Sequence, residues 1–289
     1  MLIYGYQGGY FMIKKYKPFI ISFYVVAVIA MIFAAFYDLS LDKMLNNTSN
    51  SFAIWLQNTG EIPSRLVCPL AGAVLFYTVK NKFAKLASLF IELGGSAYLG
   101  YYFGKYFFVD DENRMVFSII YGLGVGVIIL FAGNYIKVEP KYTDALKTIA
   151  LISVIVMFVQ IGLIEVMKYL WGRVRFRDLL ASGNFEAFTP WYVLNGINGN
   201  KSFPSGHTAG ASMSYLLMFM PFVSDKLKNK TALCFTLPCV YTSLVAFTRL
   251  VMGAHYLSDV TMGGTVGFTI VIIALAVYQK HFNNKILNK

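Results

Sequence analysis

The sequence predicts an all-α protein, a polytopic transmembrane helix bundle of about eight spans. Of its 289 residues, 57% are hydrophobic and only 13% are charged, whereas a soluble domain has about 25% charged residues. Several apolar runs approach or exceed the roughly 20 residues that a helix needs to cross a bilayer. The basic residues lie in groups between these runs, as membrane topology requires. These observations exclude a soluble globular protein.

Eight apolar segments account for the expected helices. In chain order they are Phe19–Tyr37, Leu66–Val79, Leu86–Phe108, Met115–Ile136, Ala145–Val166, His207–Val223, Thr231–Phe247 and Tyr256–Tyr278. The first is long enough to remain in the membrane as a signal anchor. The second is the weakest, because it is short and contains Pro69, and it could be a tilted or re-entrant segment.

The third segment contains Glu92 beside Gly94 and Gly95, and small residues allow helices to pack closely. Glu92 could pair with a polar group on a neighbouring helix or mark a function of the N-terminal helices. The fourth segment has no charged residue. We find no internal repeat or low-complexity tract in the chain.

The charge distribution predicts the topology. With the N-terminus placed inside, fifteen of the 25 basic residues fall on the inner side, in five separate segments. Only three acids join them there: Glu139, Asp144 and Asp225. Because Lys and Arg concentrate on the cytoplasmic side, we expect an integral multi-pass protein of the cell membrane with both termini cytoplasmic.

The net charge of +11 is therefore interpreted as a topology signal and an attraction to anionic headgroups. It does not indicate nucleic-acid binding, which would need a soluble basic face. The three cysteines lie in apolar runs and are expected to be small core residues, neither disulfides nor metal ligands. Met12 begins MIKKYKPFIISF and is a more natural start than Met1, so the first eleven residues are interpreted as a start-site artefact.

Three polar clusters interrupt the C-terminal half of the chain. They are EVMKYLWGRVRFRD (Glu165 to Asp178), FPSGH (Phe203 to His207) and TRLVMGAHYLSD (Thr248 to Asp259). Helix parity places all three at the same end of the bundle, and the charge distribution makes that end extracytoplasmic. Charged groups at the membrane edge are costly and indicate a functional site by default.

The residue types in these clusters favour an anion site. Arg presents planar donors that match phosphate oxygens, and Lys adds a point charge. Pro204-Ser205-Gly206-His207 precedes a helix, whose first N–H groups are unpaired and attract anions. Gly206 has no side chain, so an oxygen could approach its backbone closely. No group of carboxylates and cysteines indicates a metal site.

Two histidines could carry out chemistry beside that anion. His255 and Asp259 are spaced i, i+4 and share a helix face, so the carboxylate could take the Nδ1 proton and leave Nε2 as a nucleophile or base. His207 could protonate a leaving group. The structural alternatives are an interfacial His207 and a simple helix-face hydrogen bond between His255 and Asp259. For Arg173 and Arg177 the favoured interpretation is an interfacial anchor.

At these residues the sequence resembles the type-2 phosphatidic acid phosphatase superfamily. Its motifs are K-x-x-x-x-x-x-R-P, P-S-G-H and S-R-x-x-x-x-x-H-x-x-x-D. The first corresponds to KYLWGRVRF, with Lys168 and Arg175 in register and Phe176 in place of Pro. The second is intact, and the third has Thr248 in place of Ser. The Phe176 replacement puts the local backbone in doubt, whereas Thr248 keeps the hydroxyl.

The resemblance implies a site and a mechanism. His255 would attack phosphorus and form a phosphohistidine, Asp259 would orient His255, and His207 would act as the general acid. The phosphoryl oxygens would be held by Lys168, Arg175, Ser205, Gly206 and Arg249. The family needs no metal, so no cofactor is expected.

The resemblance also implies a six-helix core with the first motif after the third helix. Here that motif follows the fifth apolar segment, so two N-terminal helices are extra. We expect a single integrated membrane domain. Residues 1–140 would form an N-terminal region with about four spans, and residues 141–289 would form the catalytic part with all three motifs.

The expected activity is a membrane-embedded phosphatase that hydrolyses the phosphate monoester or diphosphate of a lipid. The candidate substrates are undecaprenyl diphosphate, phosphatidylglycerol phosphate and phosphatidic acid. The alternatives are a lipid-phosphate phosphotransferase, a lipid A phosphatase and a non-catalytic lipid-phosphate binder. A vanadium haloperoxidase shares the motif but is normally soluble. A lipid phosphate substrate and membrane lipids are the expected partners, nucleic acid is not expected, and the sequence leaves protein partners open.

Overall fold

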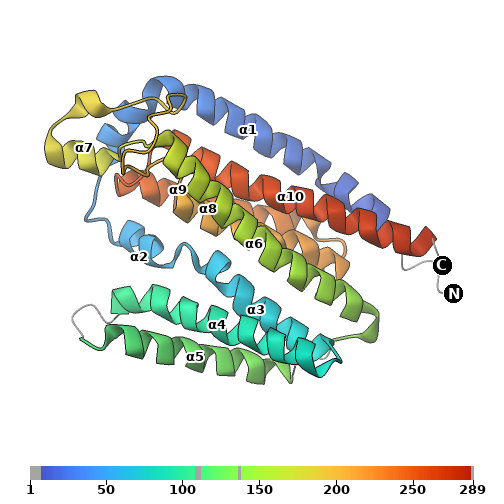
Figure 1. Cartoon of the computed structure of the whole chain (residues 1–289). Coiled ribbons are helices and arrows are strands. Elements are labelled where there is room, and N and C mark those ends of the chain that lie inside the picture. Colours follow the sequence, from blue (N-terminus) through green and yellow to red (C-terminus); the bar gives the residue numbers. More distant parts are fainter. Residues whose placement is uncertain (1–7, 108–111, 136–137, 288–289) are drawn as a thin grey trace.

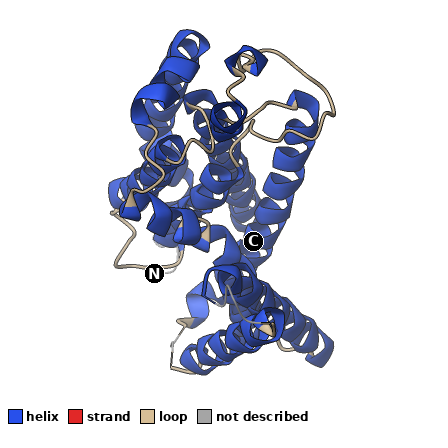
Figure 2. Cartoon of the chain, turned by 90° about the vertical axis from the view of Figure 1, so that its left-hand side faces the viewer, coloured by secondary structure: helices blue, strands red, loops and turns tan. Residues whose placement is uncertain are grey.

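The structure is a computed structural model that describes residues 8–107, 112–135 and 138–287. Every regular element in these ranges is a helix, which confirms the predicted all-α class (Figures 1 and 2). The α-helices are α1 (Gly8–Leu45), α2 (Ser51–Thr59), α3 (Ile62–Thr78), α4 (Lys82–Phe107), α5 (Arg114–Gly133), α6 (Thr143–Trp171), α7 (Phe176–Ser182), α8 (Gly206–Ser212), α9 (Thr231–Val251) and α10 (Leu257–Leu287). The 3₁₀ helices are η1 (Pro140–Tyr142), η2 (Phe185–Ala187) and η3 (Met213–Phe222). The predicted start at Met12 would remove residues 1–11, of which residues 1–7 lie outside the described ranges.

Each predicted apolar segment falls on a helix, with Phe108 and Ile136 outside the described residues. The short second segment belongs to α3, which stays helical through Pro69. The sixth is divided between α8 and η3. In the described part of the chain, five stretches are long and apolar enough to cross a membrane: Ile13–Leu45, Arg114–Gly133, Pro140–Ser182, Thr231–Val251 and Leu257–His281. The protein is therefore an integral membrane protein, and the number of eight spans stays a prediction.

The helices form two groups. Helices α1, α6, α8, α9 and α10 make the larger bundle, and α3, α4 and α5 lie together to one side of it (Figures 1 and 2). Helix α3 connects the groups, because it also contacts α6 and α8. Although α1 begins the chain, it packs against α9 and α10 within the larger bundle. The aromatic core of that bundle includes Tyr215, Phe219 and Phe268.

Close helix contact holds the smaller group together. A Cβ on Gly100 of α4 would lie 2.6 Å from the Cα of Gly122 on α5, so neither position accepts a side chain. Glu92 is fully buried in the same group, and its Oε1 accepts a 3.0 Å hydrogen bond from Ser96 Oγ. Glu92 thus has its polar partner on its own helix, one turn away.

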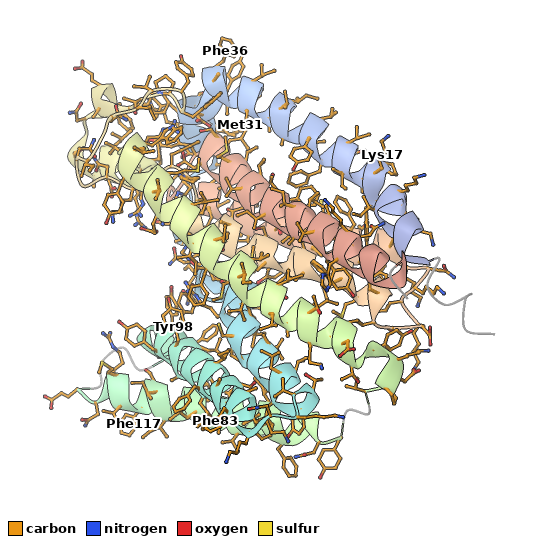
Figure 3. All side chains as sticks on the ribbon, turned by 45° about the vertical axis from the view of Figure 1, so that its right-hand side comes forward. Lys17, Met31, Phe36, Phe83, Tyr98 and Phe117 are labelled. Carbon is orange, nitrogen blue, oxygen red and sulfur yellow. The ribbon has the colours of Figure 1, made fainter. Side chains whose placement is uncertain are left out.

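The outer surface of both groups is apolar. Phe36 on α1, Phe83 on α4 and Phe117 on α5 point away from the bundle and are exposed (Figure 3). Large exposed apolar areas are unusual in soluble proteins and are the expected surface of helices that face lipid.

One end of the larger bundle gathers the polar clusters. There α6 and α9 end, α8 and α10 begin, and α7 covers them, far from the C-terminal end of α10 (Figure 1). The loops at the other end meet through Lys141, whose Nζ donates to Oδ2 of Asp225 over 2.6 Å. The predicted convergence of the three polar clusters is therefore present in the fold.

Candidate active site

A cavity of about 240 Å³ opens at the polar end of the bundle. Four of the predicted site residues line it: Arg175, His207, Arg249 and His255. Its other lining residues are Gln57, Tyr106, Arg177 and Ala254. Three guanidinium groups around so small a volume favour the binding of an anion.

The PSGH loop is fixed from both sides. Ser205 is the N-cap of α8, and its Oγ accepts from the Thr208 backbone N at 3.3 Å, as capping serines do. Its own backbone N donates to the backbone O of Asp259 over 2.9 Å, which ties this loop to the start of α10. At Gly206 an added Cβ would lie 3.1 Å from Lys168 Nζ. The motif lysine therefore lies directly over the motif glycine.

Lys168 reaches this position from the last turn of α6. Its Nζ donates to Oε1 of Glu165 over 2.5 Å. Helix α6 ends at Trp171, and Gly172, which caps it, has a left-handed backbone with φ of 48°. An added Cβ there would lie 2.0 Å from the backbone O of Gly196, so the turn requires glycine.

The replacement of the family proline by Phe176 keeps the local backbone compatible with the motif. Arg175 has φ −78° and ψ 152°, an extended conformation that a residue before proline also adopts. Helix α7 begins at Phe176, and the first position of a helix is where proline is tolerated. The Phe176 ring is buried against Leu179 and Tyr256, so the aromatic residue adds packing without changing the path of the chain.

Arg249 enters the cavity from the last turn of α9. Its side chain is 3% exposed, and its Nη1 and Nη2 lie 3.2 and 3.3 Å from Oε1 of Gln57. Gln57 belongs to α2, and sequence reasoning missed it because a single amide in a short linking segment gives no signal. The Thr248 hydroxyl donates to the backbone O of Val245 within α9.

His255 lies in the loop between α9 and α10. Its Nδ1 is 2.8 Å from the backbone O of Ser202 and 3.6 Å from Oδ2 of Asp259. Burial lowers the pKa of His255 to about 4, and Arg249 and Arg175 act in the same direction, while Asp259 opposes them. The ring is therefore neutral at pH 7. Because a carbonyl only accepts, Nδ1 carries the proton and Nε2 is the basic atom.

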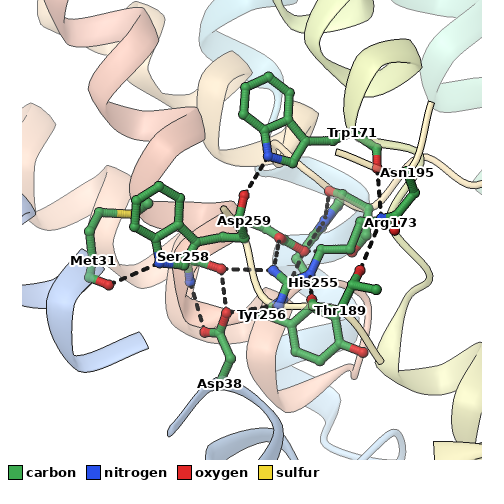
Figure 4. A network of polar contacts seen from close by, with 12 residues as sticks. Met31, Asp38, Trp171, Arg173, Thr189, Asn195, His255, Tyr256, Ser258 and Asp259 are labelled. Carbon is green, nitrogen blue, oxygen red and sulfur yellow. Dashed lines mark hydrogen bonds and ion pairs between the residues drawn. The ribbon is translucent and has the colours of Figure 1, made fainter. Parts of the chain in front are cut away.

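Asp259 is held by three donors. They are Arg173 Nη1 at 2.6 Å, Ser202 Oγ at 2.5 Å and the Tyr256 backbone N at 3.0 Å (Figure 4). The closest partner of His255 is thus the Ser202 carbonyl, and Asp259 also acts on His255 by fixing Ser202. The predicted i, i+4 pair exists, but it is the longer of the two contacts.

The interpretation of Arg173 as an interfacial anchor is wrong. Its side chain is fully buried, and it bridges Asp259 to Asp38 of α1, whose Oδ2 lies 3.0 Å from Nη2 (Figure 4). Asp38 also accepts from the Ser258 backbone N at 3.0 Å. Sequence reasoning missed Asp38, although two acids spaced i, i+4, Asp38 and Asp42, directly follow the first apolar segment. Arg177, in contrast, is exposed, with 46% of its side chain accessible.

His207 has a carboxylate partner that the sequence did not reveal. Its Nδ1 is 3.1 Å from Oε1 of Glu61, a residue that is 8% exposed between α2 and α3. The available signal was a Glu61 and Arg65 pair, spaced i, i+4, just before the weakest apolar segment. All eight predicted site residues lie at this end of the bundle, and their chemical roles stay predictions.

Comparison with known proteins supports the resemblance found in the motifs. Residues 149–283, which include all three motifs, match the family model of the PAP2 superfamily. No curated protein matches the chain. Among solved structures it is similar to a transmembrane PAP2-type phosphatidylglycerolphosphate phosphatase from Bacillus subtilis, with 18% identity, coverage of 94% of this chain and 98% of the other, and a TM-score of 0.37. That superposition is loose, so the similarity to the family rests on the family model and the motifs. Residues 149–283 of the chain are thus similar to the PAP2 superfamily, as the three motifs predicted.

Proposed function

We propose that the protein is a lipid phosphate phosphatase that works through a phosphohistidine. The observation that carries the proposal is the meeting of His207 and His255 at one cavity with Arg175 and Arg249. A site that only bound phosphate would need the cations but no neutral, oriented imidazole. The match of residues 149–283 to the family model supports the same activity.

In the first step Nε2 of His255 attacks phosphorus. The N–P bond forms as the P–O bond to the lipid breaks, and a proton from Nε2 of His207 passes to the departing oxygen. The guanidinium groups of Arg175 and Arg249 stabilise the charge that develops on the phosphoryl oxygens. The products of this step are the phosphohistidine and a lipid alcohol, or a lipid monophosphate when the substrate is a diphosphate.

In the second step water attacks phosphorus. The N–P bond breaks and its electron pair returns to Nε2 of His255, while a proton from the water returns to His207. Inorganic phosphate leaves and both histidines are restored. We expect neither step to require a metal.

The membrane setting supports a lipid substrate. The cavity lies at the end of a helix bundle whose outer surface is apolar, so a lipid could present its headgroup there while its chains stay in the bilayer. The predicted topology makes this end extracytoplasmic and both termini cytoplasmic, with the catalytic part in residues 141–289. The candidate substrates are undecaprenyl diphosphate, phosphatidylglycerol phosphate and phosphatidic acid, with a lipid A phosphate as an alternative.

A substrate panel tests the function directly. The purified protein in detergent with excess chelator should release inorganic phosphate from at least one of these lipids, and more slowly from soluble glycerol 3-phosphate. His255→Ala should abolish release, and His207→Ala should reduce it by about 10²–10⁴-fold. Full activity in either variant would overturn the mechanism. Radiolabelled phosphate appearing on a second lipid would instead identify a phosphotransferase.

The topology has its own test. An impermeant maleimide should label a cysteine placed at exposed Ser182 in intact cells. The native cysteines, Cys68, Cys234 and Cys239, are free and at least partly buried, and the unsubstituted protein is the control. Labelling only after the membrane is permeabilised would place the site in the cytoplasm.

A further inference from the structure

We propose that Glu61 is a positioning residue for His207, holding it protonated and oriented as the general acid. The inference rests on the proposed phosphatase function. It assigns a role in catalysis to the junction of α2 and α3, which lies outside the family match at residues 149–283 and outside the three motifs.

The contact between the two side chains is close and sheltered. Glu61 Oε1 lies 3.1 Å from Nδ1 of His207, and the side chains are 10% and 22% exposed. An ionised carboxylate can accept hydrogen bonds but cannot donate them, so Nδ1 of His207 must carry the proton. The proton for the leaving group then resides on Nε2, the nitrogen that Glu61 does not contact.

Glu61 is itself fixed by α3 and α4. Its Oε2 forms an ion pair with Arg65. The guanidinium of Arg65 donates to the Tyr98 hydroxyl over 2.7 Å and lies over the rings of Tyr98 and Tyr102, at 4.9 and 4.5 Å from their centroids. The two carboxylate oxygens of Glu61 therefore have different partners. Oε1 faces His207, and Oε2 faces Arg65, which the two tyrosines hold in place.

Helix α8 is shaped to accept Glu61. A Cβ on Gly210 would lie 3.1 Å from Glu61 Cγ, so glycine at this position lets the side chain lie against the helix that carries His207. Gly210 is one turn beyond the PSGH motif and is not part of it.

The charge of Glu61 favours the protonated imidazole that the first step needs. Among the described residues, the other charged or titratable groups that line the cavity are Tyr106, Arg175, Arg177, Arg249 and His255. From α6, Lys168 also places its Nζ over Gly206, next to His207. The three arginines and Lys168 disfavour a further positive charge on His207. Glu61 opposes them, although Arg65 reduces its effect.

The experiment compares Glu61→Gln with Arg65→Gln, with exposed Glu186→Gln as the matched control. It measures kcat/KM against pH for the lipid substrate that the panel identifies. In Glu61→Gln the alkaline limb should move to lower pH by about one unit, because an amide no longer favours the charged imidazole. In Arg65→Gln the Glu61 carboxylate remains. The alkaline limb of this variant should therefore stay in place or move to higher pH. Glu186→Gln should match the unsubstituted protein.

A second readout depends on the leaving group. Nitrophenolate leaves without help from an acid, whereas an alkoxide needs the proton. At pH 8, Glu61→Gln should therefore slow the hydrolysis of an alkyl phosphate about tenfold, the effect of moving the alkaline limb by about one pH unit. The rate of p-nitrophenyl phosphate hydrolysis should stay nearly unchanged. A loss that is equal for both substrates would overturn the inference.

If Glu61→Gln does not fold, Gly210→Ala takes its place in the pH experiment. The added methyl displaces the Glu61 side chain and should move the alkaline limb in the same direction. An unshifted limb in the folded variants, or equal shifts in Glu61→Gln and Arg65→Gln, would overturn the role of Glu61. If the unsubstituted protein releases no phosphate from any substrate, the proposed function itself is overturned.

Discussion

Arg173 Nη1 donates to Oδ1 of Asp259 over 2.6 Å, and both side chains are fully buried. The same guanidinium reaches Asp38 on α1 at 3.0 Å. A helix from the N-terminal region thus supports the carboxylate beside the proposed nucleophile. This arrangement neutralises one buried cation with two acids, and each group depends on the others for its counter-charge.

Removing Arg173 should strongly destabilise the protein. Arg173→Met leaves Asp38 and Asp259 buried without their cation, which typically costs about 3–5 kcal/mol of unfolding free energy. Thermal denaturation in detergent should show a clearly lower midpoint. Arg177→Met is the control, because Arg177 is exposed and its contact with Asp178 is long, at 3.8 Å. Equal midpoints for the two variants would contradict the buried bridge.

Asp38→Asn should impair turnover more than binding. The amide keeps the volume but weakens the hold on Arg173, so Asp259 and His255 lose part of their fixed geometry. We expect kcat to fall by roughly tenfold, about 1.4 kcal/mol, with little change in KM. Exposed Asp178→Asn is the matched control. A rise in KM with kcat unchanged would mean that Asp38 affects substrate binding and not the nucleophile.

Ser202→Ala should also lower kcat, because it removes one donor from Asp259. The Ser202 carbonyl remains, so His255 keeps its closest partner but loses the tie between that carbonyl and Asp259. Loss of a buried hydrogen bond costs about 1–3 kcal/mol, which should appear in both kcat and the thermal midpoint. Ser182→Ala is the control: its hydroxyl bonds the Asp178 backbone on the exposed surface. Unchanged kcat in Ser202→Ala would show that Asp259 acts on His255 directly and not through Ser202.

The neutral state of His255 gives a pH prediction. Burial lowers its pKa from the ordinary 6.5 to about 4, so the nucleophile should stay unprotonated at pH 5–7. The acid limb of kcat/KM that reports His255 should lie below about pH 5. An acid limb near 6.5 that is assigned to His255 by chemical modification would contradict this expectation.

The same shift has a consequence for stability. Between the unfolded pKa and the folded pKa, the unfolded chain binds a proton that the folded protein does not. Stability should therefore fall as the pH drops from about 6.5 to about 4, and the His255 contribution to this slope should vanish in His255→Gln. The measurement is the denaturation midpoint as a function of pH for both proteins.

Much of the architecture could be predicted because it depends on periodic or local features. The apolar segments gave the helices, and their parity predicted that the clusters around Lys168, His207 and His255 would meet. The replacement of the family proline by Phe176 keeps the local backbone for a local reason, since the first position of a helix accepts both residues. Arg173 was misjudged because an arginine at a helix end has the same sequence pattern whether it faces lipid headgroups or a buried carboxylate.

The sequence by itself determined the membrane class, the resemblance to the PAP2 superfamily and the residues of the three motifs, because these are carried by composition and short spacing. Only the tertiary structure decided which distant groups support them: Asp38 behind Arg173, Gln57 on Arg249 and Glu61 on His207. Each of these contacts joins residues more than 100 positions apart. Such pairs form when helices pack, and the partner that a polar side chain meets is set by the neighbouring helices and not by the local sequence pattern.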